Sequence, residues 1–517
     1  MPPDVSANAD LVPKQSLVDK VLHALFLARV ILATTYRHYA VGPASRQPDL
    51  TFTFSSRLVS IAAPAPSWTL LTSLATTLIR SNDRRRSLRS IRNPPRSRAQ
   101  LIAVAQKPSP AEWLEVAADK LRGAVVSEFE IPVRKRELPG LLSELSVQET
   151  GERTVPAEWV IHDSLLRSSG AEHRKPRDKV VLFMHGGAHI IMSPKTHRKM
   201  VAEISRQFRC RVLSVDYRLS PGVVFPASTL DNVSAYLYLT EDLGIPASDI
   251  IVVGDSAGGN LALTLMQYLR DAGLPQVGAG FLACPWVDLS CSFSSWDYNK
   301  DLDGISLDNE QDPFQPVRLY LMTTHPAIDE STAEFDRLKA SPYVSQALAP
   351  LEMLRDLPPL LVQSGAFECF IEEVITFVRR VRIADPKNRA TFQVWTDSPH
   401  GFHGLQEDRS GADALREAGK WLARLYSDEV DARERPAWTT RIDGMLETEK
   451  RARIARSGPI KPTKPADKTW RWERSVERLQ DPQCLPGGHE KARQAAEEAR
   501  LVAGDKAEAE VFKPVRA

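Results

Sequence analysis

Short apolar runs alternate with helix-like segments between residues 180 and 397, and this alternation limits the fold more than any other feature of the chain. Each run is rich in Val, Ile, Leu or Phe and ends in a polar or glycine-containing turn. Such runs are typical of strands buried on both faces, and the segments between them are typical of helical crossovers. The sequence therefore predicts an α/β domain with a mostly parallel sheet, whose strands span residues 180–185, 211–217, 250–255, 279–286, 359–365 and 390–397.

The chain has 517 residues, which is too long for one ordinary core, so we expect one large domain with attachments. We place the α/β domain at about residues 110–427. Residues 1–100 are expected to be helical or loose and to end in an arginine-rich linker. Residues 428–517 are dense in charge and poor in apolar periodicity, which predicts a charged, mobile tail.

Charge and cysteine content exclude several classes of protein. The 67 basic and 65 acidic residues nearly balance, so the chain has no overall attraction for nucleic acid. The five cysteines are widely spaced without a Cys-x-x-Cys pair, which predicts free thiols rather than a disulfide framework or a zinc site. The first residues lack the layout of a secretory signal peptide. We therefore expect a cytoplasmic protein that binds no nucleic acid.

Two apolar segments near the N-terminus raise the question of membrane contact. Residues 17–35 include several charged residues and favour an amphipathic helix. Residues 58–79 are uncharged and long enough to cross a bilayer, but they contain two prolines and many hydroxyl residues. We interpret this second segment as a helix that covers part of the protein, with a membrane anchor as the alternative. An arginine-rich stretch follows, so residues 17–98 are a candidate for peripheral contact with anionic lipid.

Residues 250–260, IIVVGDSAGGN, place Ser256 between a predicted strand and a predicted helix. The stretch fits the pattern G-x-S-x-G of a nucleophile elbow. A serine on such a turn projects its Oγ atom towards a substrate, and the N–H of Ala257 lies at the positive end of the helix. The alternative is a turn that needs only small residues. We interpret Ser256 as a nucleophile.

A nucleophilic serine needs a base and an acid, which in α/β hydrolases follow it along the chain in the order acid, then histidine. His400 lies in the loop after the last predicted strand, with His403 as its alternative. Glu368 follows the preceding strand and can orient the imidazole ring. Two alternative acids, Glu372 and Glu373, lie one helical turn further on.

The stretch FMHGGAHI, residues 183–190, closes the first predicted strand of the domain. Glycines at Gly186 and Gly187 allow backbone N–H groups to turn inward without a Cβ in the way. Two donors from this stretch, together with the N–H of Ala257, would make a three-pronged oxyanion hole.

Together these stretches resemble the hormone-sensitive-lipase-like branch of the α/β hydrolases, also called the alpha/beta hydrolase fold-3 group, and in particular its fungal members. The resemblance runs from about residue 156 to 427 and rests on HGGAH, VDYRLSP, VVGDSAGGNLAL, CPWVDLS, LVQSGAFECFIEE and DSPHGFHG. It implies an α/β-hydrolase fold with a helical cap, formed by the N-terminal helices and an insertion at about residues 290–345. It also implies the site: nucleophile Ser256, acid Glu368, base His400, oxyanion donors Gly187, Ala188 and Ala257, with His185 and Gly186 shaping the loop.

The resemblance implies a serine hydrolase that cleaves short- to medium-chain carboxylic esters through an acyl-enzyme, without a metal or an organic cofactor. Members of the family usually have an aromatic residue at the position of His189, so we expect a more polar pocket mouth and no strict preference for long-chain lipid. One alternative is a membrane-associated lipase or steryl ester deacetylase that docks through residues 17–98. Another is a non-catalytic small-molecule receptor, which the presence of all three triad residues disfavours. The sequence leaves the oligomeric state open.

Overall fold

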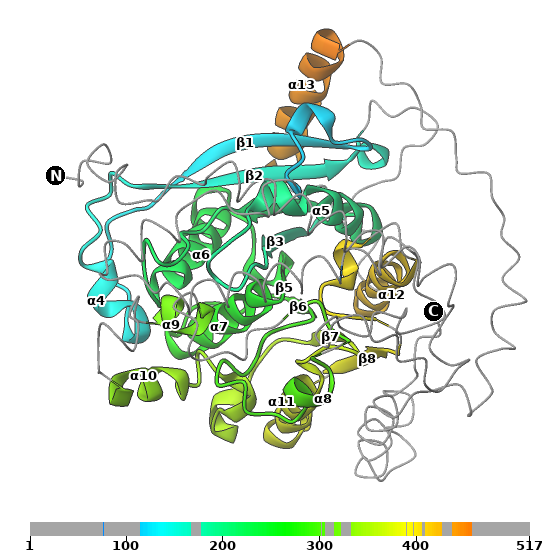
Figure 1. Cartoon of the computed structure of the whole chain (residues 1–517). Coiled ribbons are helices and arrows are strands. Elements are labelled where there is room, and N and C mark those ends of the chain that lie inside the picture. Colours follow the sequence, from blue (N-terminus) through cyan, green and yellow to red (C-terminus); the bar gives the residue numbers. More distant parts are fainter. Residues whose placement is uncertain are drawn as a thin grey trace, which may run out of the picture.

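One eight-stranded sheet forms the centre of the molecule (Figure 1). The computed structural model describes residue 76 and residues 114–166, 177–300, 302–305, 315–321, 332–388, 390–396, 398–405, 409–426 and 437–457. The strands are β1 (Ala124–Pro132), β2 (Thr154–His162), β3 (Val180–Met184), β4 (Arg211–Val215), β5 (Ile250–Asp255), β6 (Ala279–Ala283), β7 (Leu360–Gly365) and β8 (Thr391–Trp395). Their order is β1-β2-β4-β3-β5-β6-β7-β8.

The sheet is parallel from β4 to β8, and β2 pairs antiparallel with both β1 and β4. The six predicted strands coincide with β3 to β8, and this architecture confirms the predicted fold class. Strands β1 and β2 were not predicted. The second half of β1 alternates buried and exposed residues, so it has no continuous apolar run of the kind that identified the parallel strands.

Helices cover both faces of the sheet. The longer helices are α5 (Pro194–Phe208), α6 (Ala227–Leu237), α7 (Ala257–Asp271), α11 (Ile371–Ala384), α12 (Arg409–Leu425) and α13 (Ala437–Ser457). The shorter ones are α4 (Ser143–Ser146), α8 (Ser295–Tyr298), α9 (Pro316–Leu321) and α10 (Thr332–Lys339). Short 3-10 turns occupy Ala118–Lys120, Gly140–Leu142, Asp163–Leu165, Ala247–Asp249, Gln346–Leu348, Leu351–Leu354 and Phe402–Gly404, and a π turn, Tyr238–Asp242, follows α6.

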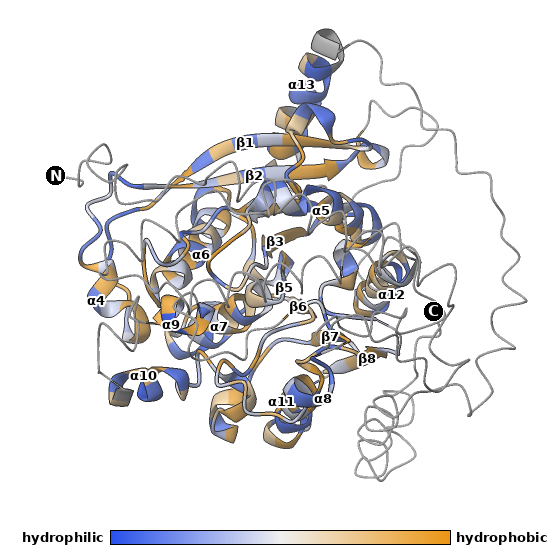
Figure 2. Ribbon diagram, viewed as in Figure 1, coloured by the Kyte–Doolittle hydropathy of each residue, from blue (hydrophilic) through white to orange (hydrophobic). Residues whose placement is uncertain are grey.

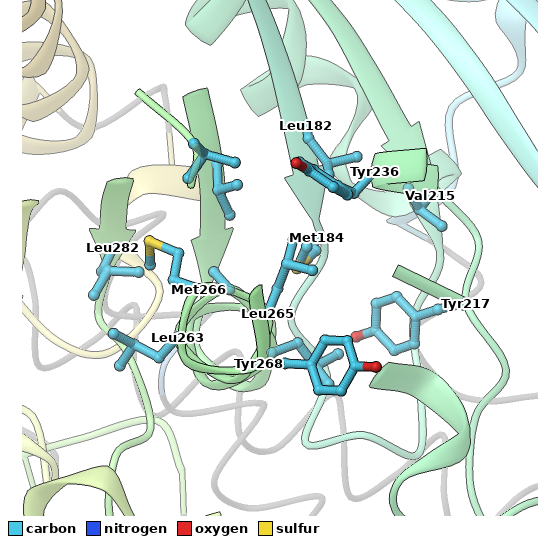
Figure 3. Close-up of a cluster of buried hydrophobic side chains, with 14 of the residues drawn as sticks. Leu182, Met184, Val215, Tyr217, Tyr236, Leu263, Leu265, Met266, Tyr268 and Leu282 are labelled. Atoms are coloured by element: carbon cyan, nitrogen blue, oxygen red, sulfur yellow. The ribbon is translucent and has the colours of Figure 1, made fainter. Parts of the chain in front are cut away.

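Strand β3 shows how the core is divided between two layers. Val181 and Phe183 belong to the layer that contains α5 and α12, whereas Leu182 and Met184 belong to the layer that contains α6, α7 and α11. Successive side chains of a strand point to opposite faces, so a strand covered on both sides is apolar along its whole length. Figure 2 shows β3 coloured as hydrophobic, and α5 and α13 with mixed colours. Figure 3 shows Leu182 and Met184 in the layer that contains α7.

Residues 437–457 differ from the expectation of a mobile tail, because they form α13, which packs against β1 (Figure 1). Trp438, Ile442 and Leu446 are buried and recur every fourth residue, which places them on one side of the helix. The Arg211 guanidinium, buried beneath the helix, pairs with Asp443 at 2.6 Å. The high charge of this segment concealed the short apolar stripe through which the helix packs.

The two apolar N-terminal segments, residues 17–35 and 58–79, lie outside the described ranges except for Thr76. Within the described ranges, no helix combines the length and the apolar character needed to span a bilayer. Of the insertion at about residues 290–345, the structure describes residues 290–300, 302–305, 315–321 and 332–345, which include the three short helices α8, α9 and α10.

Candidate active site

Ser256 lies between the end of β5 and the first residue of α7, with φ +55° and ψ −122°. A positive φ is uncommon for a residue with a Cβ, and such strain persists only where the surroundings enforce it. Two backbone hydrogen bonds hold the turn: Ser256 donates its N–H to Ala283, and Trp286 donates its N–H to the Ser256 carbonyl. The serine therefore sits on a sharp, fixed turn at the carboxyl edge of the sheet.

The glycines of this turn are explained by close packing. A Cβ on Gly258 would lie 2.0 Å from the carbonyl oxygen of Met184, at the end of the neighbouring strand. A Cβ on Gly254 would lie 2.2 Å from the carbonyl oxygen of Gly258. Small residues are thus required for the close approach of α7 to the sheet, and Ser256 lies on the same turn.

The side chains of Ser256, His400 and Glu368 form a continuous hydrogen-bonded chain. His400 Nε2 lies 2.8 Å from Ser256 Oγ, and His400 Nδ1 lies 3.0 Å from Glu368 Oε2. Glu368 is fully buried, and its Oε1 accepts the N–H of Gly365 at 2.5 Å. When His400 donates its Nδ1 proton to Glu368, its Nε2 can accept the hydroxyl proton of Ser256.

Opposing effects set the pKa of His400. Burial lowers this pKa, but the hydrogen bond and the charge of Glu368 raise it, followed by the charges of Asp303 and Asp255. The net result is a pKa above the ordinary value of 6.5. The arrangement thus stabilises the imidazolium, which is the form a base takes after it has accepted a proton.

The alternative residues occupy other positions. His403 is buried, its Nε2 lies 2.8 Å from Gln363 Oε1, and burial lowers its pKa to about 3. Glu372 accepts the N–H of Ser295, and Glu373 accepts the N–H groups of two residues that follow β6. The structure therefore brings His400 and Glu368, and none of these alternatives, to Ser256.

The stretch after β3 turns sharply beside Ser256, with φ +115° at Gly187 and +54° at Ala188. A Cβ on Gly187 would lie 2.1 Å from the carbonyl oxygen of Ile191, so only glycine fits there. Among the described residues, no protein acceptor takes the N–H groups of Gly187 and Ala188. Gly186 differs, because its N–H donates to Asp255 Oδ1 at 3.0 Å. This geometry leaves two donors of the loop unused and anchors a third.

Asp255 is a site residue whose role the sequence analysis missed. Its Oδ1 holds Gly186, and its Oδ2 lies 3.3 Å from His197 Nε2 on α5. Burial alone would raise the pKa of Asp255, but the charge and hydrogen bond of His197 lower it below its ordinary value. The position within the G-x-S-x-G pattern was the only signal in the sequence, and nothing there indicated His197 as the partner.

His189 differs from the expectation of a polar residue at the pocket mouth. Its side chain is 1% exposed and stacks on Tyr320 with ring centroids 3.7 Å apart. Burial lowers its pKa to about 3, so the ring is neutral. His189 therefore takes the place of an aromatic residue in a buried stack.

Among the described residues, one group of three side chains could provide ligands for a metal ion. Side-chain atoms of Cys284, Glu368 and His400 lie within 4.8 Å of one another. Burial, followed by the charge of Glu368, raises the pKa of the Cys284 thiol well above its ordinary value. Glu368 and His400 are already hydrogen-bonded to each other, so a metal bound there would compete with the contact that orients the histidine.

Comparison with known proteins shows which family the chain resembles. The sequence model of the alpha/beta hydrolase fold family matches residues 181–404. The chain is 32% identical over 245 residues to an "Acetyl-hydrolase" of Streptomyces hygroscopicus, covering 47% of this chain and 75% of the relative. It is 28% identical over 225 residues to an "Esterase" of Acinetobacter venetianus, covering 43% and 67%.

A fungal relative also matches: an "AB hydrolase superfamily protein" of Schizosaccharomyces pombe is 25% identical over 300 residues, covering 55% of this chain and 80% of the relative. This match agrees with the resemblance to fungal sequences. From these matches and the eight-stranded sheet, we conclude that the chain belongs to the alpha/beta hydrolase fold family, in its hormone-sensitive-lipase-like fold-3 group.

Proposed function

We propose that the protein is a serine hydrolase that cleaves carboxylic esters through an acyl-enzyme formed on Ser256. The observation that carries this proposal is the chain of contacts from Glu368 through His400 to Ser256, at 3.0 and 2.8 Å, on a serine held at positive φ. The relatives named as an esterase and an acetyl-hydrolase support an ester substrate with a short acyl chain.

In the first half of the reaction, His400 Nε2 accepts the proton of Ser256 as Oγ attacks the ester carbonyl carbon. The carbonyl oxygen becomes an oxyanion and accepts hydrogen bonds from the N–H groups of Gly187, Ala188 and Ala257. Ala257 is the first residue of α7, so its N–H lies at the positive end of the helix. Removing one such donor typically raises the barrier by about 3 kcal/mol.

The negative charge of Glu368 stabilises the imidazolium that forms on His400. The imidazolium then donates its proton to the alcohol, which leaves, and the acyl group remains on Ser256. Water enters, His400 accepts one of its protons, and the resulting attack releases the acid and restores the serine. Every proton in this cycle moves through His400 Nε2.

The membrane-associated alternative, a lipase or steryl ester deacetylase, depends on residues 17–98, which lie outside the described ranges except for Thr76. It stays a prediction, as does the cytoplasmic location. The receptor alternative needs a site that lacks a nucleophile or a base. The three side chains that lie in hydrogen-bond contact here favour the enzyme.

The test is hydrolysis of p-nitrophenyl esters, from acetyl to palmitoyl, by the wild type and by Ser256→Ala. We expect the wild type to prefer short to medium chains and the variant to lose on the order of 10⁴- to 10⁶-fold in kcat. A preference for palmitoyl would support the lipase alternative. Ester turnover that is unchanged in purified Ser256→Ala would refute the proposal.

A further inference from the structure

Two buried polar side chains that follow α8, Asn299 and Asp303, contact the backbone of both loops that carry Glu368 and His400. We propose that these two residues act as a positioning clamp: they hold the loop of the acid Glu368 and the loop of the base His400 in a fixed position relative to each other. This inference rests on the proposed function and assigns a second task to an insertion that was expected only to cover the pocket.

Asp303 supplies the acceptors of the clamp. Its Oδ1 accepts the N–H of His400 itself at 3.0 Å, and its Oδ2 accepts the N–H of Cys369, next to Glu368, at 2.7 Å. The same Oδ1 also accepts the N–H of Gly304 at 2.6 Å. One carboxylate therefore joins two loops that come from β7 and β8 and are distant from it in sequence.

Asn299 supplies the donors. Its Nδ2 donates to the carbonyl oxygens of Ala366 at 3.0 Å and Glu368 at 2.8 Å. Asp303 donates its N–H to the carbonyl of Asn299 at 2.8 Å, so the two residues share one turn of backbone. The turn that carries Asn299 and Asp303 therefore binds backbone groups before and after the Glu368 Cα atom. These groups are the carbonyl of Ala366 before it, and the carbonyl of Glu368 and the N–H of Cys369 after it.

Because Asn299 and Asp303 are buried, loss of their hydrogen bonds would be costly. Both side chains have no exposed surface, and a buried polar group is costly unless its hydrogen bonds are made. Burial also raises the pKa of Asp303 to about 6. A carboxylate that is ionised although burial raises its pKa lowers the stability of the folded protein. Such a cost in stability is common where a residue is kept for function.

Asp303 reaches the two loops through the backbone N–H groups of Cys369 and His400, so we assign it a positioning role and not a catalytic one. Its charge also acts on His400, whose ring lies among the carboxylates of Glu368, Asp255 and Asp303, the thiol of Cys284 and the ring of Phe370. Asp303 is one of the groups that raise the pKa of His400. Its loss should therefore alter both the geometry and the titration of the base.

The test compares Asp303→Asn with Asp297→Asn in the full-length protein. Asp297 is exposed on the same segment, so its variant removes an equal charge without touching either loop. The rate at which a fluorophosphonate labels Ser256 reports activation of the serine whether or not the protein hydrolyses esters. Kinetic constants and the pH profile of kcat/KM are then measured with the best p-nitrophenyl ester.

For Asp303→Asn we expect labelling and kcat to fall on the order of 10²-fold, because small misplacements of reacting groups have effects of this size. KM should change little, and the acid limb of the pH profile should move to lower pH. Asp297→Asn should behave as the wild type. Wild-type labelling, kcat and pH profile in folded Asp303→Asn would overturn the clamp.

A second variant covers the case in which Asp303→Asn does not fold. Asn299→Ala removes the donors to Ala366 and Glu368 and keeps the buried charge, and it should also slow labelling and lower kcat. Normal rates in folded Asn299→Ala would contradict the proposal. A wild type that reacts with fluorophosphonate but cleaves no ester would refute only the proposed function, since the labelling comparison still decides the clamp.

Discussion

His400 Nε2 lies 2.8 Å from Ser256 Oγ, although 144 residues separate the two along the chain. The contact is made because Ser256 follows β5 and His400 follows β8, and parallel strands present their carboxyl ends at one edge of the sheet. Glu368 lies between Ser256 and His400 in the sequence. It follows β7, so it lies at the same edge of the sheet. The hydrogen-bonded chain is therefore a consequence of the sheet topology.

Replacing His400, the proposed base, should have a different effect from replacing its neighbour in sequence, His403. We expect His400→Asn to lower kcat on the order of 10⁴- to 10⁶-fold, because among the described residues His400 is the side chain that lies in hydrogen-bond contact with Ser256 Oγ. His403→Asn should keep most of the activity and unfold at a lower temperature, because His403 is buried and bonded to Gln363. Ester hydrolysis and thermal unfolding of the two variants check this, and equal losses of activity would contradict the assignment of the base.

The pH profile should report the raised pKa of His400. His400 accepts a proton only when it is neutral, so kcat/KM should rise with pH through the pKa of His400, which lies above the ordinary value of 6.5. Glu368→Gln removes the group that raises this pKa most, so the rise should move to lower pH. The same variant should lower kcat on the order of 10⁴-fold, as loss of the charged partner does in other triads.

Glu368→Asp is the control for that prediction, since it keeps the charge but shortens the side chain. Its kcat should fall, while its pH profile should stay closer to that of the wild type. A profile that is identical in the wild type and in Glu368→Gln would show that this carboxylate does not govern the histidine.

Helix α13 should contribute measurably to stability through one ion pair. Arg211 is fully buried and its guanidinium pairs with Asp443 at 2.6 and 2.7 Å. Asp443→Ala leaves that charge without its carboxylate, which should lower the free energy of unfolding by about 3–5 kcal/mol. The exposed pair of Arg337 and Glu334 is the comparison, and Glu334→Ala should change the unfolding midpoint little. Equal small effects in denaturant unfolding would mean that α13 is held by its apolar contacts alone.

The sequence predicted those parts of the fold that repeat a simple pattern. Strands β3 to β7 are buried along almost their whole length, so each is a visible apolar run, whereas the second half of β1 has exposed positions that break its run. The docked stripe of α13 lies among charged residues, so composition concealed it. The segments β1 and α13 were missed because the burial of their residues depends on packing against distant parts of the chain, which a short stretch of sequence does not reveal.

The site was predictable to the extent that it lies in short motifs at strand ends. Ser256, His400 and Glu368 follow three strands in family order, and the structure brings them together. Asp303 has no such signal, because the groups that it accepts from the two distant loops are backbone N–H groups, which every residue type except proline can supply. His189 was expected at the pocket mouth, since its polarity suggested solvent, but it stacks on Tyr320 instead.

Substitution of Gly258 tests whether the close packing of α7 against the sheet holds Ser256 in its strained conformation. A Cβ there would lie 2.0 Å from the Met184 carbonyl oxygen, so Gly258→Ala forces α7 away from β3. We expect a loss of about 1–3 kcal/mol or more in unfolding free energy. Activity should fall as well, because Ser256 and the N–H of Ala257 belong to the same turn.

Gly444→Ala is the matched control, since this glycine lies inside α13 and a Cβ would meet nothing within 4 Å. This variant should be neutral or slightly more stable, because alanine favours a helix over glycine by roughly 1 kcal/mol. Thermal unfolding and fluorophosphonate labelling of the two variants give stability and serine reactivity separately. If Gly258→Ala unfolds like the wild type and labels at the wild-type rate, the close approach of α7 is not what holds Ser256 in its strained position.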